Sequence, residues 1–400
     1  MKILHTSDWH IGKRLGAVYR LQEQKKVLAE ICEIANEQAV DAVIIAGDLF
    51  DTFNPPIDAL ELFYATVKKL SNNGTRPVIA IAGNHDSPDR IEAPNPLARD
   101  NGVFLFGYPK SEYSLYANDL PFSITKVDKG FIEFTLQDNQ KLRIILAPFA
   151  NEFRMKEAFI ENETSSIVES LNTFWNHLAN TYCDSKGVNI LVGHHLMLAS
   201  QTDEIIEPDD EKPIQAISAL LPTSIIPPHI QYVALGHLHQ QQIISHSPFV
   251  TYSGSPCAYS FSEAMQKKSI SIVTAFPNKP AQLETIELAN ARMLIRKKCK
   301  SIQDALDWLA AHQNCYVELT IIHDSYFSPA EIKSLHAAHS GIIYIIPEIH
   351  NVEELEQSEQ LPSRNASIDE LFVSYFEHKH GQKPNKELLT LFSEIRGESL

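Results

Sequence analysis

Side chains able to bind metal ions follow five short apolar runs of the sequence. Each run is apolar, as is typical of a buried strand, and is followed by aspartate, asparagine or histidine. The candidate ligands are Asp8, His10, Asp48, Asn84, His194, His237 and His239. Because ligands collect at the carboxyl edge of the strands in open α/β sheets, we expect these seven side chains to meet there.

The donor types indicate which chemistry such a cluster could perform. Nitrogen and oxygen ligands without thiolate favour Mn²⁺, iron or Mg²⁺ over a structural zinc. Two divalent ions about 4 Å apart can bind both the attacking and the leaving oxygen of an in-line phosphoryl displacement. Such a pair needs a bridging carboxylate, for which Asp48, a lone acid at the tip of a central strand, is best placed. Asp8 and His10, like His237 and His239, are two residues apart, and extended backbone would point each pair to one face.

Hydrophobic periodicity predicts the elements that hold these residues. Helical spacing over 22–38 and 57–70 separates the first three strands and gives βαβ units. Alternation over 131–136 and 141–146 indicates antiparallel strands, and 152–180 has a helical pattern. We therefore predict an α/β fold, a mixed sheet or a two-sheet sandwich, flanked by helices. Strands over 267–275 and 281–288 would complete a first domain, residues 1–288.

A small α+β domain is predicted over 289–350. It begins with a basic run containing Arg292, Arg296, Lys297, Lys298 and Lys300. Helices over 302–312 and 329–339 alternate with strands over 316–322 and 341–346. Between the two histidine-bearing strands of the first domain, the acidic stretch 202–213 contains two prolines and is predicted to be a surface loop. We predict that the basic run supplies part of a contact with nucleic acid, and the alternative is a solvated face.

The C-terminal residues follow a polar linker, 351–366. Ser367-Ile368-Asp369-Glu370 matches a capping box, and a second helix is expected to begin near Pro384. The apolar residues of this segment, 367–400, include Leu371, Phe372, Tyr375, Phe376, Leu388, Leu391 and Phe392. Two short helices are too small to form a core of their own, so we expect them to bind another chain.

Composition limits the class of protein. The sequence has no apolar run of about 18 residues, and its N-terminus enters a strand directly, so we predict a cytoplasmic protein without a membrane span or signal peptide. Five scattered cysteines without a CxxC motif argue against a disulfide framework. The net charge of -16 opposes nucleic-acid binding at long range unless metal ions or a basic partner neutralise it.

The motifs together resemble those of a known superfamily. Asp8-x-His10, Gly47-Asp48-x-x-Asp51, Gly83-Asn84-His85-Asp86, Gly193-His194 and Gly236-His237-x-His239 resemble the calcineurin-like metallophosphoesterases. The longer stretches 6–12, 46–51 and 83–87, with Arg90, are similar to the SbcD family of bacterial nuclease subunits. The resemblance extends over the small domain and the helical tail, and hence over nearly the whole chain.

The resemblance implies a role for each residue. Asp8, His10, Asp48 and His239 would surround one ion, and Asp48, Asn84, His194 and His237 the other, with Mn²⁺ as the expected metal and Mg²⁺ as the alternative. His85 would face the scissile phosphate as a catalytic residue, and Asp51 would orient it. We expect His194, which directly follows the glycine, to be the ligand, and the adjacent His195 to be structural or to support the ligands.

It also implies a function and partners. These are cleavage of double-stranded DNA ends and hairpins, a coiled-coil SMC-like ATPase of the SbcC type bound through the C-terminal helices, and a homodimer within a heterotetramer. Two other classes remain open at this point. One is a small-molecule or protein phosphoesterase, against which the helical tail argues. The other is a non-catalytic DNA-end scaffold, which would be expected to have lost some of its ligands.

Overall fold

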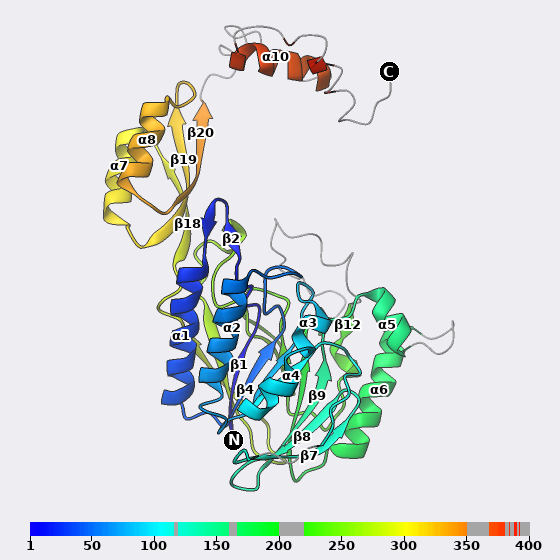
Figure 1. Cartoon of the computed structure of the whole chain (residues 1–400). Coiled ribbons are helices and arrows are strands. Elements are labelled where there is room, and N and C mark those ends of the chain that lie inside the picture. Colours follow the sequence, from blue (N-terminus) through cyan, green and yellow to red (C-terminus); the bar gives the residue numbers. More distant parts are fainter. Residues whose placement is uncertain are drawn as a thin grey trace.

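The computed structural model describes residues 1–115, 119–159, 166–199, 220–349 and 368–380, together with residues 384, 388, 389 and 392 (Figure 1). Two mixed β-sheets pack face to face to form its largest unit. The first has the order β17 (Gln282–Glu287), β16 (Ser269–Thr274), β1 (Lys2–Thr6), β4 (Ala42–Ala46), β5 (Val78–Ile81) and β6 (Val103–Phe106). The second has the order β14 (Gln242–His246), β15 (Phe249–Tyr252), β13 (Tyr232–Leu235), β10 (Val188–Gly193), β9 (Lys141–Ala147), β8 (Phe131–Thr135) and β7 (Ser123–Asp128).

The strand sequences explain the layers. In β4, Ala42, Ile44 and Ala46 belong to the core between the sheets, whereas Val43 and Ile45 pack towards the helices. The outer face of the first sheet is covered by α1 (Leu21–Glu37) and α2 (Ile57–Leu70), and that of the second by α6 (Ile167–Tyr182). Apolar residues on both faces of a strand are typical of a sheet buried on both sides. The predicted α/β class is confirmed, in its two-sheet form.

Parallel strands give both sheets a shared carboxyl edge. β1, β4, β5 and β6 run parallel, as do β9, β10, β13 and β15 in the other sheet. Short elements complete this unit: β2 (Arg14–Leu15), β3 (Val18–Tyr19), α3 (Pro88–Glu92), α4 (Asn95–Ala98), α5 (Glu152–Phe159), β11 (Met197–Leu198) and β12 (Leu221–Pro222). The helical pattern over 152–180 thus forms α5 and α6, and residues 160–165 lie outside the described ranges.

A smaller unit follows, drawn at the upper left of Figure 1. Its parallel sheet has the order β18 (Met293–Cys299), β19 (Cys315–His323) and β20 (Ile342–Ile349), with α7 (Ile302–Ala311) and α8 (Pro329–Ala338) on one face. Most of the basic run therefore forms a strand that the sequence pattern did not predict. Leu294 and Tyr316 pack with Leu15, Ala258 and Phe261 of the larger unit.

The C-terminal segment is described mainly by α10 (Ile368–His380). Ile368 and Leu371 on this helix are about half exposed. The predicted loop 202–213, the linker, Ser367 and most of the second tail helix lie outside the described residues. No helix in the described part of the chain is long and apolar enough to cross a membrane. All five cysteines are buried and free.

Candidate metal centre

Asp8 and Asp48 lie in two loops that hydrogen-bond to each other. The Asp8 amide donates to the Gly47 carbonyl at 2.9 Å, and the His10 amide donates to the Asp48 carbonyl at 2.9 Å. The loop after β1 is thereby fixed against the loop after β4. Both loops lie at the carboxyl edge of the first sheet, as the sequence pattern predicted.

The backbone of these loops is not extended, and the expected geometry of the paired ligands is wrong. β1 ends at Thr6, and Asp8 and His10 have φ angles of 53° and 41°. Asp48 at 49° and His237 at 102° are also on the positive side. Such conformations cost roughly 1–3 kcal/mol each and concentrate at functional sites. The hydrogen bonds between the loops hold the backbone in these turn conformations, and the turns bring the side chains together.

One group of donors comprises Asp8, His10 and His239, whose ligand atoms all lie within 4.8 Å of one another. The Nε2 atoms of His10 and His239 are 3.0 Å apart. Asp8 is fixed by Ser7 Oγ and by the His237 amide, which donates to Asp8 Oδ1 at 2.9 Å. Residues from both sheets thus contribute to this group.

A second group lies on the other side of Asp48. The Asn84 side-chain oxygen is 3.0 Å from His194 Nε2 and 2.9 Å from His237 Nδ1. Asp48 Oδ2 is 3.3 Å from His194 Nε2 and 3.5 Å from His10 Nε2. One carboxylate oxygen therefore stands between the two groups of donors.

Two glycines make this convergence sterically feasible. A Cβ on Gly83 would lie 2.2 Å from Asp48 Oδ1, and a Cβ on Gly47 would lie 2.2 Å from His194 Nδ1. Gly47 also has a φ of 93°, which L side chains rarely adopt. Close approach therefore requires glycine at both positions, and at Gly47 the backbone conformation requires it as well.

Burial and mutual charge set the protonation of the cluster. Burial raises the pKa of Asp8 to about 6, although His194 and His239 oppose it. Burial acts in the same direction on Asp48, but His194 and His10 outweigh it and hold the pKa of that carboxyl well below its usual value. Burial disfavours the charged form of His194, yet Asp48 overcomes this and raises the His194 pKa to about 9. Asp48 is thus the ionised centre of the cluster at neutral pH.

His85 lies beside the two groups and is half-buried. Its amide donates to Asp48 Oδ1 at 2.8 Å, and its Nδ1 donates to the main-chain carbonyl of Asp51 at 2.8 Å. The Asp51 carboxylate instead pairs with Lys13 at 3.0 Å. Asp51 therefore contacts His85 through its backbone. His85 also forms a potential donor group with His10 and Asp51.

The neighbouring His195 has a different environment. It is buried, and burial lowers its pKa to about 3, helped by the adjacent His194. Its carbonyl accepts a hydrogen bond from the Tyr252 hydroxyl at 2.9 Å. In the described part of the chain it belongs to none of the potential metal-binding groups, which are Asp8, His10 and His239; His10, Asp51 and His85; and Asp8, Asp48 and His194.

The donor set fits divalent metal ions. Two unprotonated imidazole nitrogens 3.0 Å apart, as in His10 and His239, need a proton or a cation between them. Carboxylate, amide and imidazole donors suit Mn²⁺, Mg²⁺ or iron. His10 Nδ1 and His237 Nε2 are buried and have no hydrogen-bond partner. In each ring it is therefore the other nitrogen, His10 Nε2 or His237 Nδ1, that contacts the cluster. The seven predicted ligands are thus brought together.

Comparison with known proteins agrees with this arrangement. Residues 1–241 match the family model described as calcineurin-like phosphoesterase. The chain belongs to this family. It is 34% identical over 407 residues to the SbcD subunit of the nuclease SbcCD of Bacillus subtilis, covering 99% of this chain and 97% of the relative. The protein of the same name from Staphylococcus epidermidis is 30% identical over 302 residues, 72% of each chain.

Among solved structures, a dimetal phosphatase from Danio rerio is 11% identical with a TM-score of 0.40, covering 73% of this chain and 99% of that one. All seven candidate ligands of the phosphoesterase fall within the 241 matched residues. The segment after β15 lies beyond that match, whereas the Bacillus subtilis relative spans it.

Several residues that hold the phosphoesterase site were not identified from the sequence. Asp86 accepts the amides of Gly83 at 2.8 Å and of Leu49 and Phe50 at 3.0 Å, and so fixes the Asp48 loop. Ser253 Oγ is 2.8 Å from Ser7 Oγ, which contacts Asp8. A signal was present, because the apolar run Phe249–Tyr252 ends in Ser253-Gly254-Ser255 and is a sixth strand end.

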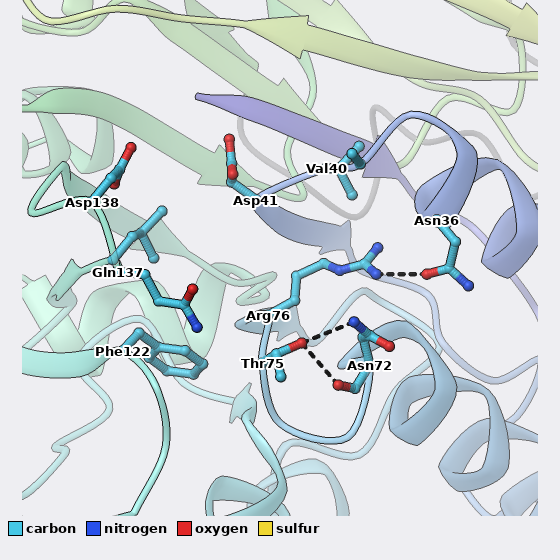
Figure 2. Close-up of a pocket in the computed structure, with 11 residues that line it drawn as sticks. Asn36, Val40, Asp41, Asn72, Thr75, Arg76, Phe122, Gln137 and Asp138 are labelled. Carbon is cyan, nitrogen blue, oxygen red and sulfur yellow. Dashed lines mark hydrogen bonds between the residues drawn. The ribbon is translucent and has the colours of Figure 1, made fainter.

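A pocket of about 540 Å³ lies at the opposite edge of the first sheet, where β4 and β5 begin (Figure 2). Arg76 in its wall donates to the Asn36 side-chain oxygen at 2.7 Å. Its other terminal nitrogen, Nη1, is shielded from solvent and has no hydrogen-bond partner. Asp41 and Asp138 also line the pocket. It therefore offers a ligand more negative than positive charge, and it is separate from the metal-binding cluster.

Proposed function

We propose that the chain is a two-metal phosphodiesterase that cleaves DNA as the nuclease subunit of a complex with a coiled-coil ATPase. One observation carries the proposal: Asp48 Oδ2 lies between two groups of nitrogen and oxygen donors, 3.5 Å from His10 Nε2 and 3.3 Å from His194 Nε2. A shared carboxylate is what a pair of ions acting on one phosphate requires. The family membership and the names of the relatives support the same function.

In this proposal the two donor groups hold one ion each. Asp8, His10 and His239 would bind the first and Asn84, His194 and His237 the second, with Asp48 common to both. Bound there, divalent ions would polarise the phosphate and lower the pKa of an attacking water. Mn²⁺ is the proposed metal, with Mg²⁺ as the alternative, because the donors are oxygen and imidazole nitrogen.

His85 is proposed as the catalytic residue. Because its Nδ1 is committed to the Asp51 carbonyl, Nε2 is the nitrogen left for substrate. A doubly protonated His85 would donate from Nε2 to a phosphoryl oxygen or to the leaving oxygen, which develops negative charge as the bond breaks. Asp51 and the Asp48 side chain, which binds the His85 amide, would hold the ring in position.

DNA is proposed as the substrate, with double-strand ends and hairpins as the favoured forms. The division into a nuclease domain (1–288), a DNA-contacting domain (289–350), a linker and an ATPase-binding segment (367–400) belongs to the same proposal. The face of the small sheet opposite its helices carries Arg296 and Lys298, each more than half exposed. These cations pair with Glu318 at 2.9 Å and Glu348 at 2.6 Å, and DNA phosphates would compete with both carboxylates.

The proposed partner of the C-terminal segment is an SbcC-type ATPase. Exposed Ile368 and Leu371 on α10 support this, because an apolar helix face without a core needs a partner surface. Removing residues 351–400 should abolish co-elution with the ATPase in size-exclusion chromatography and leave metal binding intact. Co-elution of the truncated chain at wild-type affinity would contradict the proposal. Sedimentation of the chain tests the homodimer.

The decisive test compares substrates. The purified chain, alone and co-expressed with the ATPase, should cleave a DNA hairpin and a double-stranded end in Mn²⁺ and lose this activity in EDTA. A nitrophenyl phosphodiester should be hydrolysed more weakly, and a phosphoserine peptide should not be. Preference for the peptide or for a small diester over DNA would favour a phosphatase, and DNA binding without cleavage would favour a scaffold.

A further inference from the structure

A buried ion pair lies behind His239 in the segment that follows β15. Glu263, in a 3₁₀ turn (Phe261–Glu263), pairs with Lys268, and both side chains are about 4% exposed or less. Removing such a pair from water is unfavourable unless the charges gain further hydrogen bonds. The contacts that these two side chains make therefore indicate what the pair holds in place.

Glu263 uses both carboxylate oxygens. Its Oε1 accepts the Tyr259 amide at 2.9 Å and lies 3.4 Å from His239 Nδ1. Its Oε2 pairs with Lys268 Nζ and lies 3.4 Å from Ser255 Oγ. The carboxylate is thus held from three sides and presents one oxygen to the imidazole.

Lys268 reaches the backbone of the same histidine. Its Nζ donates to the His239 carbonyl at 3.0 Å and to Ser255 Oγ at 3.1 Å. The Ser255 amide donates to the same carbonyl at 3.0 Å. The pair therefore fixes both the ring and the main chain of His239.

The contact with Glu263 also determines which ring nitrogen faces the cluster. A carboxylate accepts the proton of Nδ1, which leaves Nε2 unprotonated and directed at His10 Nε2, 3.0 Å away. A carboxylate in this position orients a metal-binding imidazole and makes it a stronger donor. In the second group, Nδ1 of His194 instead donates to a neutral acceptor, the Ala46 carbonyl at 2.7 Å.

We infer that Glu263, neutralised by Lys268, is a positioning residue for His239, and that it strengthens metal binding selectively at the position formed by Asp8, His10 and His239. This rests on the proposed two-metal function. Replacing the carboxylate should weaken that position and leave the other, whose ligands it does not touch, unchanged. Loss of a partner of this kind lowers metal affinity about 10- to 100-fold.

The experiment titrates the full-length apo chain with Mn²⁺, following free Mn²⁺ by electron paramagnetic resonance. Wild type should bind two equivalents. Glu263→Gln should bind one equivalent with unchanged affinity and the other about 10- to 100-fold more weakly. Glu287→Gln is the matched control, because Glu287, at the end of β17, forms an exposed pair at 2.9 Å with Lys267, which precedes β16. This variant should bind both ions normally.

A kinetic measurement separates positioning from catalysis. Raising the Mn²⁺ concentration should restore the maximal diesterase rate of Glu263→Gln, so that the defect lies in the metal requirement. Circular dichroism checks the fold. If the single variant does not fold, Glu263→Gln/Lys268→Met removes both charges, avoids an unpaired buried lysine and is judged by the same titration.

Unchanged affinities, or equal weakening of both equivalents, in a folded variant would overturn the inference while leaving the proposed function intact. A wild-type chain that binds fewer than two ions would instead overturn the proposed function, and the inference with it.

Discussion

Replacing Asp48 by asparagine should remove both metal ions while preserving the fold. Asparagine has the shape of aspartate, and its side-chain oxygen can still accept the His85 amide, which donates to Asp48 Oδ1 at 2.8 Å. The substitution removes the negative charge that Asp48 presents to both donor groups. The matched control is Asp41→Asn, because Asp41 flanks the other end of β4 and hydrogen-bonds the Lys2 amide at 2.7 Å, away from the cluster.

The magnitude follows from the separations at the site. Asp48 Oδ2 lies 3.5 Å and 3.3 Å from the two nearest imidazole nitrogens. At such distances, unit charges attract by about 4 to 5 kcal/mol at an effective dielectric constant of 20. Since about 1.4 kcal/mol is a factor of ten, affinity should fall at least about 1,000-fold for each ion.

Isothermal titration calorimetry and elemental analysis after dialysis measure the effect, and thermal unfolding of the apo chain checks the fold. Wild type and Asp41→Asn should retain two equivalents, and Asp48→Asn should retain none at micromolar metal. Loss of a single equivalent would show that Asp48 serves one ion, and retention of both at wild-type affinity would refute its place at the centre of the site.

Three further predictions concern other parts of the chain. His85→Asn should keep both metal equivalents but lower the diesterase rate at least about 100-fold, since it removes a proton donor; loss of an equivalent would make His85 a ligand. Arg296→Gln/Lys298→Gln should reduce the slope of DNA affinity against salt by about two, whereas Lys297→Gln, on the helix-covered face beside Trp308, should leave it unchanged. The third concerns acid stability. A hydrogen bond from Arg143 lowers the pKa of Asp184 to about 2, below its value in the unfolded chain. The stabilisation contributed by the Asp184 carboxylate is therefore present above pH ~4 and lost as pH falls towards 2. Asp184→Asn should lower the free energy of unfolding at pH 7 by less than about 1 kcal/mol, because the carboxylate is half exposed, and flatten its acid dependence as measured by urea unfolding.

The sequence was sufficient for the parts of the fold that depend on local pattern. Helix α2 has the predicted bounds, Ile57–Leu70, and α1 differs by one residue at each end. Strand ends located the donors because parallel strands share a carboxyl edge. The small unit was recognised apart from its first strand, β18. In β18, charged side chains lie on both faces, with Arg296 and Lys298 opposite the helices and Lys297 on the helix-covered face. They obscured the alternation of apolar and polar residues that marks a strand.

Tertiary contacts account for what was missed. The left-handed backbone of Asp8 and His10 is imposed by hydrogen bonds to Gly47 and Asp48, which no local pattern encodes. Glu263 reaches His239 only because β15 and the following segment bring it there. Asp51 was expected to orient His85, but the sequence could not indicate that its backbone carbonyl makes the contact.

The segment after β15 also connects the metal-binding cluster to the small unit. Glu263 and Lys268 hold His239, while between them the Met265 amide donates to the Leu294 carbonyl of β18 at 2.9 Å. Phe261 packs against Tyr344 of β20 with ring centroids 5.8 Å apart. The hydrogen bonds that position one metal ligand and the contacts that seat the small sheet therefore share a few consecutive residues. Since a packed interior transmits strain, a shift of the small unit would act on His239 more directly than on His194 or Asn84, which are held by other loops.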